Sequence, residues 1–193
     1  MTREIEFFWD TGSTNTYFAL HLIRPLAARY GATIRMRPFN LGYVFRHHNY
    51  VLMEEPAAKI ANRKRDLQRW AARYDLPFRF PDMFPIKTAP SLRGSLVARE
   101  RGCEDAYLDA VFSRYWEQND ASVAGLEGLA AVAREIGQDP ESFVADIESP
   151  RMKQALVRET DAALARGVFG APSFIVGGSC SGGRTAWSSS RMR

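Results

Sequence analysis

The chain of 193 residues has the length of one domain, or of one domain with a large insertion, which excludes a repeat array or a multidomain protein. Its 46% hydrophobic, 12% aromatic and 25% charged residues can build a sizeable core, which excludes a disordered chain. The net charge of +4 does not point to nucleic acid, because residues 179–193 hold three arginines and no acid, leaving 23 basic and 22 acidic residues elsewhere.

The N-terminal segment predicts a βαβ unit. Residues 5–9 are an apolar and aromatic run of strand formers that ends at turn residues. Apolar residues then recur at helical spacing as far as Tyr30, and Ser13, Thr14 or Asn15 is the candidate helix cap. Residues 33–39 alternate apolar and basic side chains, as a half-buried strand does. Two strands joined by a helix predict a right-handed crossover between parallel strands.

A long helical stretch follows, and the chain then returns to β-structure. Residues 57–74 place a basic face opposite apolar residues, and further helical segments begin at Ser91, Glu104, Val123, Pro140 and Arg151. A turn-rich segment leads into a short apolar strand at 173–176. This order predicts an α/β protein with a thioredoxin-like fold and a large all-α insertion. The expected division is 1–42 and 161–178 for the thioredoxin-like part and 43–160 for the helical insertion.

Residues 179–193 do not fit this outline. Serine, glycine and arginine dominate them, and neither strand nor helix periodicity survives, although a thioredoxin-like sheet requires a further strand and a closing helix here. Two interpretations remain open. The segment is a solvated terminus, or it is the product of a shifted reading frame, because a one-base insertion in a plausible coding sequence restores a strand, a turn and an amphipathic helix. The genomic DNA decides between them.

The turn before the first helix is a candidate site for thiol chemistry. A helix N-terminus presents free N–H groups and a positive dipole end, which together stabilise a thiolate. Neither Cys103 nor Cys180 belongs to a C-x-x-C motif, so no dithiol exchange, disulfide framework or metal site is expected. Ser13 instead offers a hydroxyl that could donate to the sulfur of a bound thiol and lower its pKa. The alternative is that Ser13 is only a helix cap.

Ala171 and Pro172 strengthen the interpretation of Ser13 as a site residue. Thioredoxin-like folds carry a cis-proline before a buried strand, facing the active turn, and the residue preceding it pairs its backbone with a peptide-like ligand. An Ala-Pro pair alone is an ordinary strand start. Together with the turn around Ser13 it is a more specific signal.

The sequence resembles the 2-hydroxychromene-2-carboxylate isomerase family, which is related to kappa-class glutathione transferases and more distantly to DsbA-type oxidoreductases. The resemblance covers residues 4–178 and is carried by four blocks: FFWDTGSTNTYFA at 7–19, PFNLGYVF at 38–45, DLQRWAARYDLPFRFP at 66–81 and GVFGAPSFIVGG at 167–178.

This resemblance implies glutathione as cofactor and Ser13 as the catalytic serine. Cofactor-binding roles are expected for Ser13, Arg46, Asn49, Ala171 and Pro172. The implied reaction is the reversible addition of a glutathione thiolate to 2-hydroxychromene-2-carboxylate, followed by ring opening, bond rotation and loss of the thiol. The chain departs from the family in having Thr14 where a proline often follows the serine, and in lacking its W-G-x-D-R segment near the C-terminus.

We therefore expect a cytoplasmic isomerase of aromatic-compound degradation. Its expected partners are a small aromatic substrate and a second copy in a homodimer; nucleic acid, a membrane and a bound metal are not expected. Two alternatives stay open. One is a kappa-class-like glutathione transferase that uses the same serine, and the other is a DsbA-like thiol- or peptide-binding protein without dithiol activity.

Overall fold

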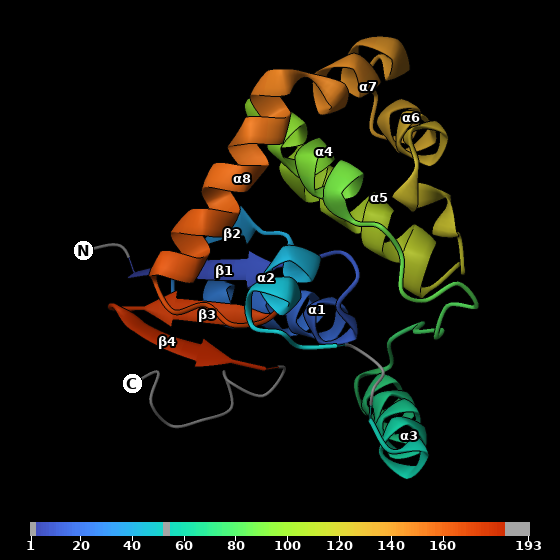
Figure 1. Ribbon diagram of the computed structural model, residues 1–193, viewed down its shortest axis with the longest axis vertical. Helices are drawn as coiled ribbons and strands as arrows, with labels where there is room; N and C mark the ends of the chain where they lie inside the picture. Colours follow the sequence, from blue (N-terminus) through green and yellow to red (C-terminus); the bar gives the residue numbers. More distant parts are fainter. Residues whose placement is uncertain (1–2, 52–54, 184–193) are drawn as a thin grey trace.

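The computed structural model describes residues 3–51 and 55–183, which form a four-stranded sheet and the helices that pack around it (Figure 1). The strand order of the sheet is β2-β1-β3-β4. Strand β1 (Arg3–Trp9) pairs parallel with β2 (Ala32–Pro38) and antiparallel with β3 (Ser173–Val176). Helix α1 (Thr14–Arg29) connects the two parallel strands, so the predicted βαβ unit is confirmed, and Ser13 is its cap.

Strand β1 contributes to a core on each face of the sheet, because successive residues of a strand point in opposite directions. Ile5, Phe7 and Trp9 belong to the main core, which continues into α1 and the inserted helices. Phe8 belongs to a second core on the opposite face, with residues of α8 (Pro150–Ala165) and Val44 of α2 (Leu41–His47). The aromatic residues of one short strand thus anchor helices on both sides of the sheet.

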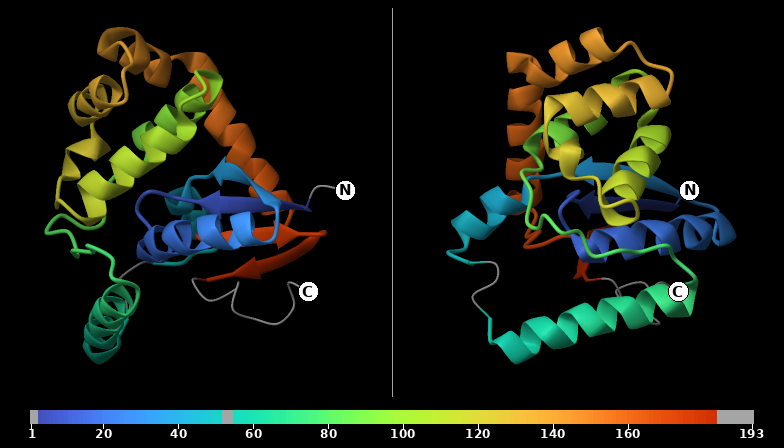
Figure 2. Two further views of the ribbon diagram at one scale, coloured as in Figure 1. Left: turned by 180° about the vertical axis from the view of Figure 1, so that it is seen from behind. Right: turned by 90° about the vertical axis from the view of Figure 1, so that its right-hand side faces the viewer.

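The inserted segment is helical, as predicted. It contains α3 (Ala57–Tyr74), α4 (Ala89–Glu100), α5 (Glu104–Trp116), the 3-10 turn η1 (Ala121–Ala124), α6 (Leu126–Glu135), α7 (Pro140–Glu148) and most of α8. The two views of Figure 2 show α4 to α7 gathered above one end of the sheet, whereas α3 stands apart from them. The expected boundaries at 42 and 160 fall inside α2 and α8, both of which contribute to the second core, so the division of the chain stays a prediction.

The start of the unusual C-terminal segment is a strand. β4 (Ser179–Gly182) pairs antiparallel with β3, and the amide of Gly183 donates to the carbonyl oxygen of Pro172 at 3.0 Å. Composition did not predict this strand, because its serines and glycines are poor strand formers whose pairing is imposed by the exposed edge of β3. The hypothesis of a shifted reading frame concerns residues 179–193, of which 184–193 lie outside the described residues, so it stays untested. Within the described residues, none of the helices is both long and apolar enough to span a membrane.

Candidate functional site

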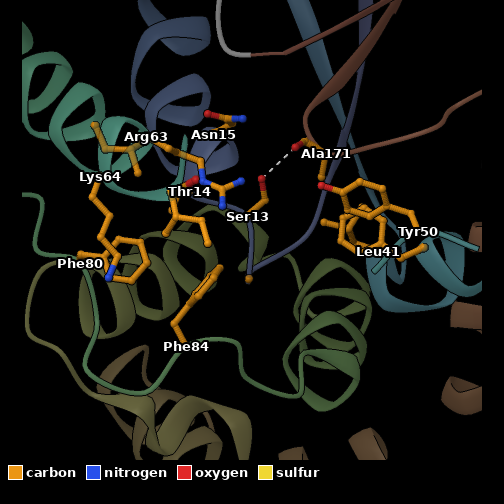
Figure 3. A pocket seen from close by; sticks show the side chains of 14 residues that line it. Ser13, Thr14, Asn15, Leu41, Tyr50, Arg63, Lys64, Phe80, Phe84 and Ala171 are labelled. Atoms are coloured by element: carbon orange, nitrogen blue, oxygen red, sulfur yellow. Dashed lines mark hydrogen bonds between the residues drawn. The ribbon is translucent and has the colours of Figure 1, made fainter. Parts of the chain in front are cut away.

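Ser13 lies where the start of α1 meets the loop before β3. Its Oγ accepts a hydrogen bond from the Thr16 amide at 3.2 Å, which is the cap interaction, and donates one to the carbonyl oxygen of Ala171 at 2.8 Å (Figure 3). The Ala171-Pro172 peptide is cis, and Pro172 is buried. Ser13, Ala171 and Pro172 therefore lie together in the fold. The hydrogen-bonded residues Ser13 and Ala171 are 158 residues apart in the sequence.

A cavity of about 190 Å³ opens at Ser13. Figure 3 shows Arg63 and Lys64 of α3 approaching it from one side, and Leu41 and Tyr50 from the other. Its lining residues are Gly12 to Asn15 of the turn and α1, Leu41 and Phe45 of α2, Tyr50, Ile60, Arg63, Lys64 and Leu67 of α3, Phe80, Phe84 and Ala171. The wall thus combines aromatic rings with two cationic side chains, which suits a ligand that is both flat and anionic.

The electrostatics of α1 and α3 favour negative charge in this cavity. The first turn of α1 contains no acidic residue, so the positive end of its dipole is not neutralised there. The Lys64 ammonium lies 4.9 Å from the centre of the Phe80 ring, and the Arg63 guanidinium pairs with Glu55 at 2.7 Å. Arg63 and Lys64 belong to the basic face predicted for residues 57–74, and sequence reasoning did not assign them to the site.

A second cavity adjoins the first and shares Gly12, Leu41 and Phe45 with it. Arg46 lines this second cavity, and it does not line the cavity at Ser13. Asn49 follows α2 in a left-handed backbone conformation with φ of 53°, is exposed, and lines neither cavity. The structure therefore gathers three of the five predicted residues and leaves the cofactor-binding roles of Arg46 and Asn49 without a contact that supports them.

The turn that carries Ser13 is fixed by residues that sequence reasoning missed. The Trp116 indole N–H of α5 donates to the carbonyl oxygen of Thr11 at 2.9 Å, and the hydroxyls of Thr11 and Ser91 are hydrogen-bonded at 3.0 Å. Both contacts come from the helical insertion. The insertion thus positions the turn as well as covering it.

Asp10 is the buried ionisable group nearest this turn in sequence. Its carboxylate is 1% exposed and accepts hydrogen bonds from the amides of Gly12 and Leu41 and from the Thr88 hydroxyl. Burial raises the pKa of Asp10 from 3.8 to about 6, and the three hydrogen bonds limit that rise. Its only sequence signal is its place at the end of a buried strand.

Neither cysteine of the chain is an activated thiol. Desolvation raises the pKa of Cys103, and it also raises the pKa of Cys180 on β4. A nucleophilic cysteine needs the opposite change, a lowered pKa. Thiolate chemistry at Ser13 would therefore depend on a thiol that binds in the cavity. Within the described residues, no group of three histidine, cysteine or acidic side chains gathers in a way that could hold a metal ion.

Comparison with known proteins identifies relatives of this chain by sequence and by structure. A family model described as a DSBA-like thioredoxin domain matches residues 4–193. The 2-hydroxychromene-2-carboxylate isomerase of Sphingobium xenophagum is 30% identical over 185 residues, covering 91% of this chain and 90% of the relative. A solved structure of a 2-hydroxychromene-2-carboxylate isomerase superposes with a TM-score of 0.82 at 29% identity, covering 94% of this chain and 89% of that one.

A second class of relatives is more distant. The protein named glutathione S-transferase kappa 1 of Caenorhabditis elegans is 25% identical over 181 residues, covering 87% of this chain and 78% of the relative.

Proposed function

The chain belongs to the 2-hydroxychromene-2-carboxylate isomerase family and carries a DSBA-like thioredoxin domain, and from this premise we propose that it is a glutathione-dependent isomerase of a chromene-type aromatic carboxylate. The observation that carries the proposal is the contact of the Ser13 hydroxyl with the Ala171 carbonyl oxygen, inside a cavity of aromatic and cationic side chains. The reaction would belong to the degradation of aromatic compounds.

The residues around Ser13 fit glutathione. Glutathione is a small peptide that carries two carboxylates, and the cavity offers the cations Arg63 and Lys64 together with the backbone of Ala171 beside a cis-proline. When bound, it supplies a thiolate, a good nucleophile that is also a good leaving group. Cys180 and Cys103 are unsuited to that role because the pKa of each is raised.

Ser13 would hold the thiolate by a hydrogen bond. A serine hydroxyl has one proton, which here is directed at the Ala171 carbonyl oxygen. Rotation of the hydroxyl toward a sulfur frees that carbonyl to accept an N–H from a peptide-like ligand, so one ligand would satisfy both groups. Thr16 still donates its amide to Ser13 Oγ, which leaves the cap in place during the exchange.

The aromatic side chains would orient the substrate ring. Phe45, Phe80 and Phe84 line the cavity and offer faces and edges against which a flat ring packs. Arg63 or Lys64 would pair with the carboxylate of the substrate or with one from glutathione. Packing of the substrate ring against these aromatic side chains would displace water from the reacting bond, which would strengthen the hydrogen bond from Ser13.

The test is a titration of bound glutathione, followed by its thiolate absorbance near 240 nm. The proposal expects the pKa of the bound thiol to lie below that of free glutathione, and to rise by about one to two pH units in Ser13→Ala, because a hydrogen bond to a charged group contributes roughly 1.5–3 kcal/mol. Isomerisation of 2-hydroxychromene-2-carboxylate should fall in parallel. An unchanged thiol pKa in Ser13→Ala removes Ser13 from the mechanism.

Ser149→Ala is the matched control. Ser149 caps α8 and accepts the Met152 amide at 3.2 Å, the same distance at which Ser13 accepts the Thr16 amide. Both variants lose a helix cap, at a cost of about 1 kcal/mol each. Only Ser13→Ala should change the thiol pKa, so a change in both would assign the effect to stability.

A glutathione transferase is the second candidate, supported by the similarity to the kappa-class protein of Caenorhabditis elegans. The two activities differ in what happens to glutathione. An isomerase returns it unchanged after each turnover, whereas a transferase consumes one molecule for each electrophile. Free thiol measured before and after turnover on the chromene carboxylate and on 1-chloro-2,4-dinitrobenzene separates them. Binding without turnover on either would favour a binding protein. A cytoplasmic location and a homodimer stay predictions.

A further inference from the structure

The Asp10 carboxylate joins three separate segments of the chain. Its Oδ1 accepts the Gly12 amide at 2.8 Å, and its Oδ2 accepts the Leu41 amide at 2.9 Å and the Thr88 hydroxyl at 3.0 Å. Gly12 belongs to the turn that carries Ser13, Leu41 is the first residue of α2, and Thr88 is the residue before α4. One carboxylate therefore connects the Ser13 turn, the start of α2 and the start of α4.

These three segments are walls of the candidate site. Gly12 and Leu41 line both cavities, and Thr88 lines the second one. The packing between them is close, because a Cβ atom added to Gly12 would lie 3.0 Å from Thr88 Cγ2 and 3.4 Å from Asp10 Oδ1. The contacts of Asp10 thus lie between closely packed walls of the site.

The donors around Asp10 match the ionised carboxylate and do not match the neutral acid. Two of the three are backbone N–H groups, which only donate. A proton on the carboxyl group has one group that could accept it, the Thr88 hydroxyl, whose own hydrogen bond to Asp10 would then be lost. Protonation therefore weakens contacts with the segments that Asp10 holds.

Ionisable groups also surround this carboxylate from other elements. Burial raises the pKa of Tyr115 on α5, and the charge of Asp10 adds to that rise. Arg46 of α2, Lys87 in the segment before α4 and Arg93 of α4 line the same cavity as Asp10. Arg93 is held away by its ion pair with Glu148 and by a hydrogen bond to the carbonyl oxygen of Ile147.

We propose that Asp10 is a positioning residue, whose ionised carboxylate holds the Ser13 turn, the start of α2 and the start of α4 in the form that binds ligand. Its protonation releases these walls and weakens binding at the Ser13 cavity. The ligand part of this inference rests on the proposed function, whereas the coupling between Asp10 and the three segments does not. The experiments below separate the two.

The first experiment follows the backbone amide resonances of Gly12 and Leu41 by NMR between pH 4.5 and 8, without ligand. Because burial raises the pKa of Asp10 to about 6, both amides should titrate together with a midpoint near pH 6. Asp10→Asn should abolish this common transition while the resonances of distant α7 stay unchanged. Independent midpoints, or no transition in the wild type, would overturn the proposal.

Thr88 provides a second pair of variants that keep the charge of Asp10. Thr88→Val is isosteric and removes the hydroxyl donor, whereas Thr88→Ser keeps it. Loss of a donor to the charged form raises the pKa of a carboxyl group. The amide midpoint should therefore move to higher pH in Thr88→Val and stay near the wild-type value in Thr88→Ser. Equal midpoints in the two variants would contradict the role of this hydrogen bond, even if Asp10→Asn does not fold.

The last experiment measures binding of S-methylglutathione, which has no ionisable thiol, by calorimetry at pH 8 and pH 5. If only protein with ionised Asp10 binds, a pKa of about 6 weakens the apparent affinity about tenfold at pH 5. Asp10→Asn should bind weakly at both pH values, without that dependence. Equal affinity of the wild type at the two pH values overturns the proposal. No binding at either pH rejects the proposed function instead, and the NMR titration then decides the role of Asp10 alone.

Discussion

Asp10→Asn should remove a pH dependence of stability that the wild-type protein has between about pH 4 and pH 6. Burial raises the pKa of Asp10 from 3.8 to about 6, so the folded protein binds this proton more tightly than the unfolded chain does. The resulting stabilisation is fully present below pH 3.8 and is lost as the pH rises through 6. Ionised Asp10 therefore lowers the stability of the folded protein at neutral pH, although its carboxylate accepts three hydrogen bonds.

The magnitude follows from the two pKa values. A difference of about 2 pH units corresponds to about 3 kcal/mol at roughly 1.4 kcal/mol per unit. No discount for solvent screening applies, because Asp10 is 1% exposed. Asparagine removes the buried charge but also loses an acceptor, at a cost of roughly 1–3 kcal/mol. These two effects oppose each other, so the free energy of unfolding of the variant at a single pH does not test the prediction. The change of that free energy with pH does.

The assay is urea unfolding of the wild type and Asp10→Asn at intervals from pH 4 to pH 7.5. Other carboxyl groups, such as Glu6 and Glu100, have a lowered pKa from their arginine partners and contribute the opposite slope, so the difference between the two proteins is the quantity to plot. Relative to the variant, the wild type should lose about 2.5 kcal/mol across this range, because unfolded Asp10 is already partly ionised at pH 4. Asp161→Asn, an exposed change on α8, is the control. A flat difference, or a wild type that gains stability relative to Asp10→Asn as the pH rises, refutes the assignment.

Three further predictions concern the turn, the core and the cavity. Trp116→Phe keeps the ring but leaves the Thr11 carbonyl without its indole donor, and should lower the free energy of unfolding by about 1–3 kcal/mol and weaken glutathione binding, measured by urea unfolding and calorimetry. Gly94→Ala places a Cβ 2.1 Å from the buried Tyr107 hydroxyl and should lower the free energy of unfolding by about 1–3 kcal/mol or more, without a specific change in thiol pKa. Lys64→Gln should weaken glutathione binding and reduce its dependence on salt, measured by calorimetry at two ionic strengths.

Matched changes test the reasoning behind these predictions. Gly170→Ala introduces a Cβ with nothing within 4 Å, so it should be tolerated where Gly94→Ala is not. Arg65→Gln, on the exposed part of the same helix as Lys64, should leave glutathione affinity unchanged. Equal effects of Arg65→Gln and Lys64→Gln would mean that α3 acts only through its overall charge.

The secondary structure could be predicted from the sequence because local patterns determine it. An apolar and aromatic run defines β1, and alternating apolar residues define β2. Helical spacing interrupted by glycine or proline defines α1, α3 and the later helices. Strand β4 could not be predicted, because its residues have little preference for a strand and pair only where the edge of β3 is available. Strand β4 therefore forms because β3 offers it a pairing edge.

Some residues of the candidate site could likewise be identified from the sequence, and others depend on how the elements pack. Ser13 and Pro172 could be identified from the sequence, because each depends on a local feature, a helix start and a residue before a strand. Whether Ser13 reaches Ala171, and whether Arg63 lines a cavity or faces solvent, depends on how α1, α3 and β3 pack. The role of Asp10 depends most on tertiary structure, because its three donors lie 2, 31 and 78 residues away, and only folding surrounds one carboxylate with all of them and removes it from water.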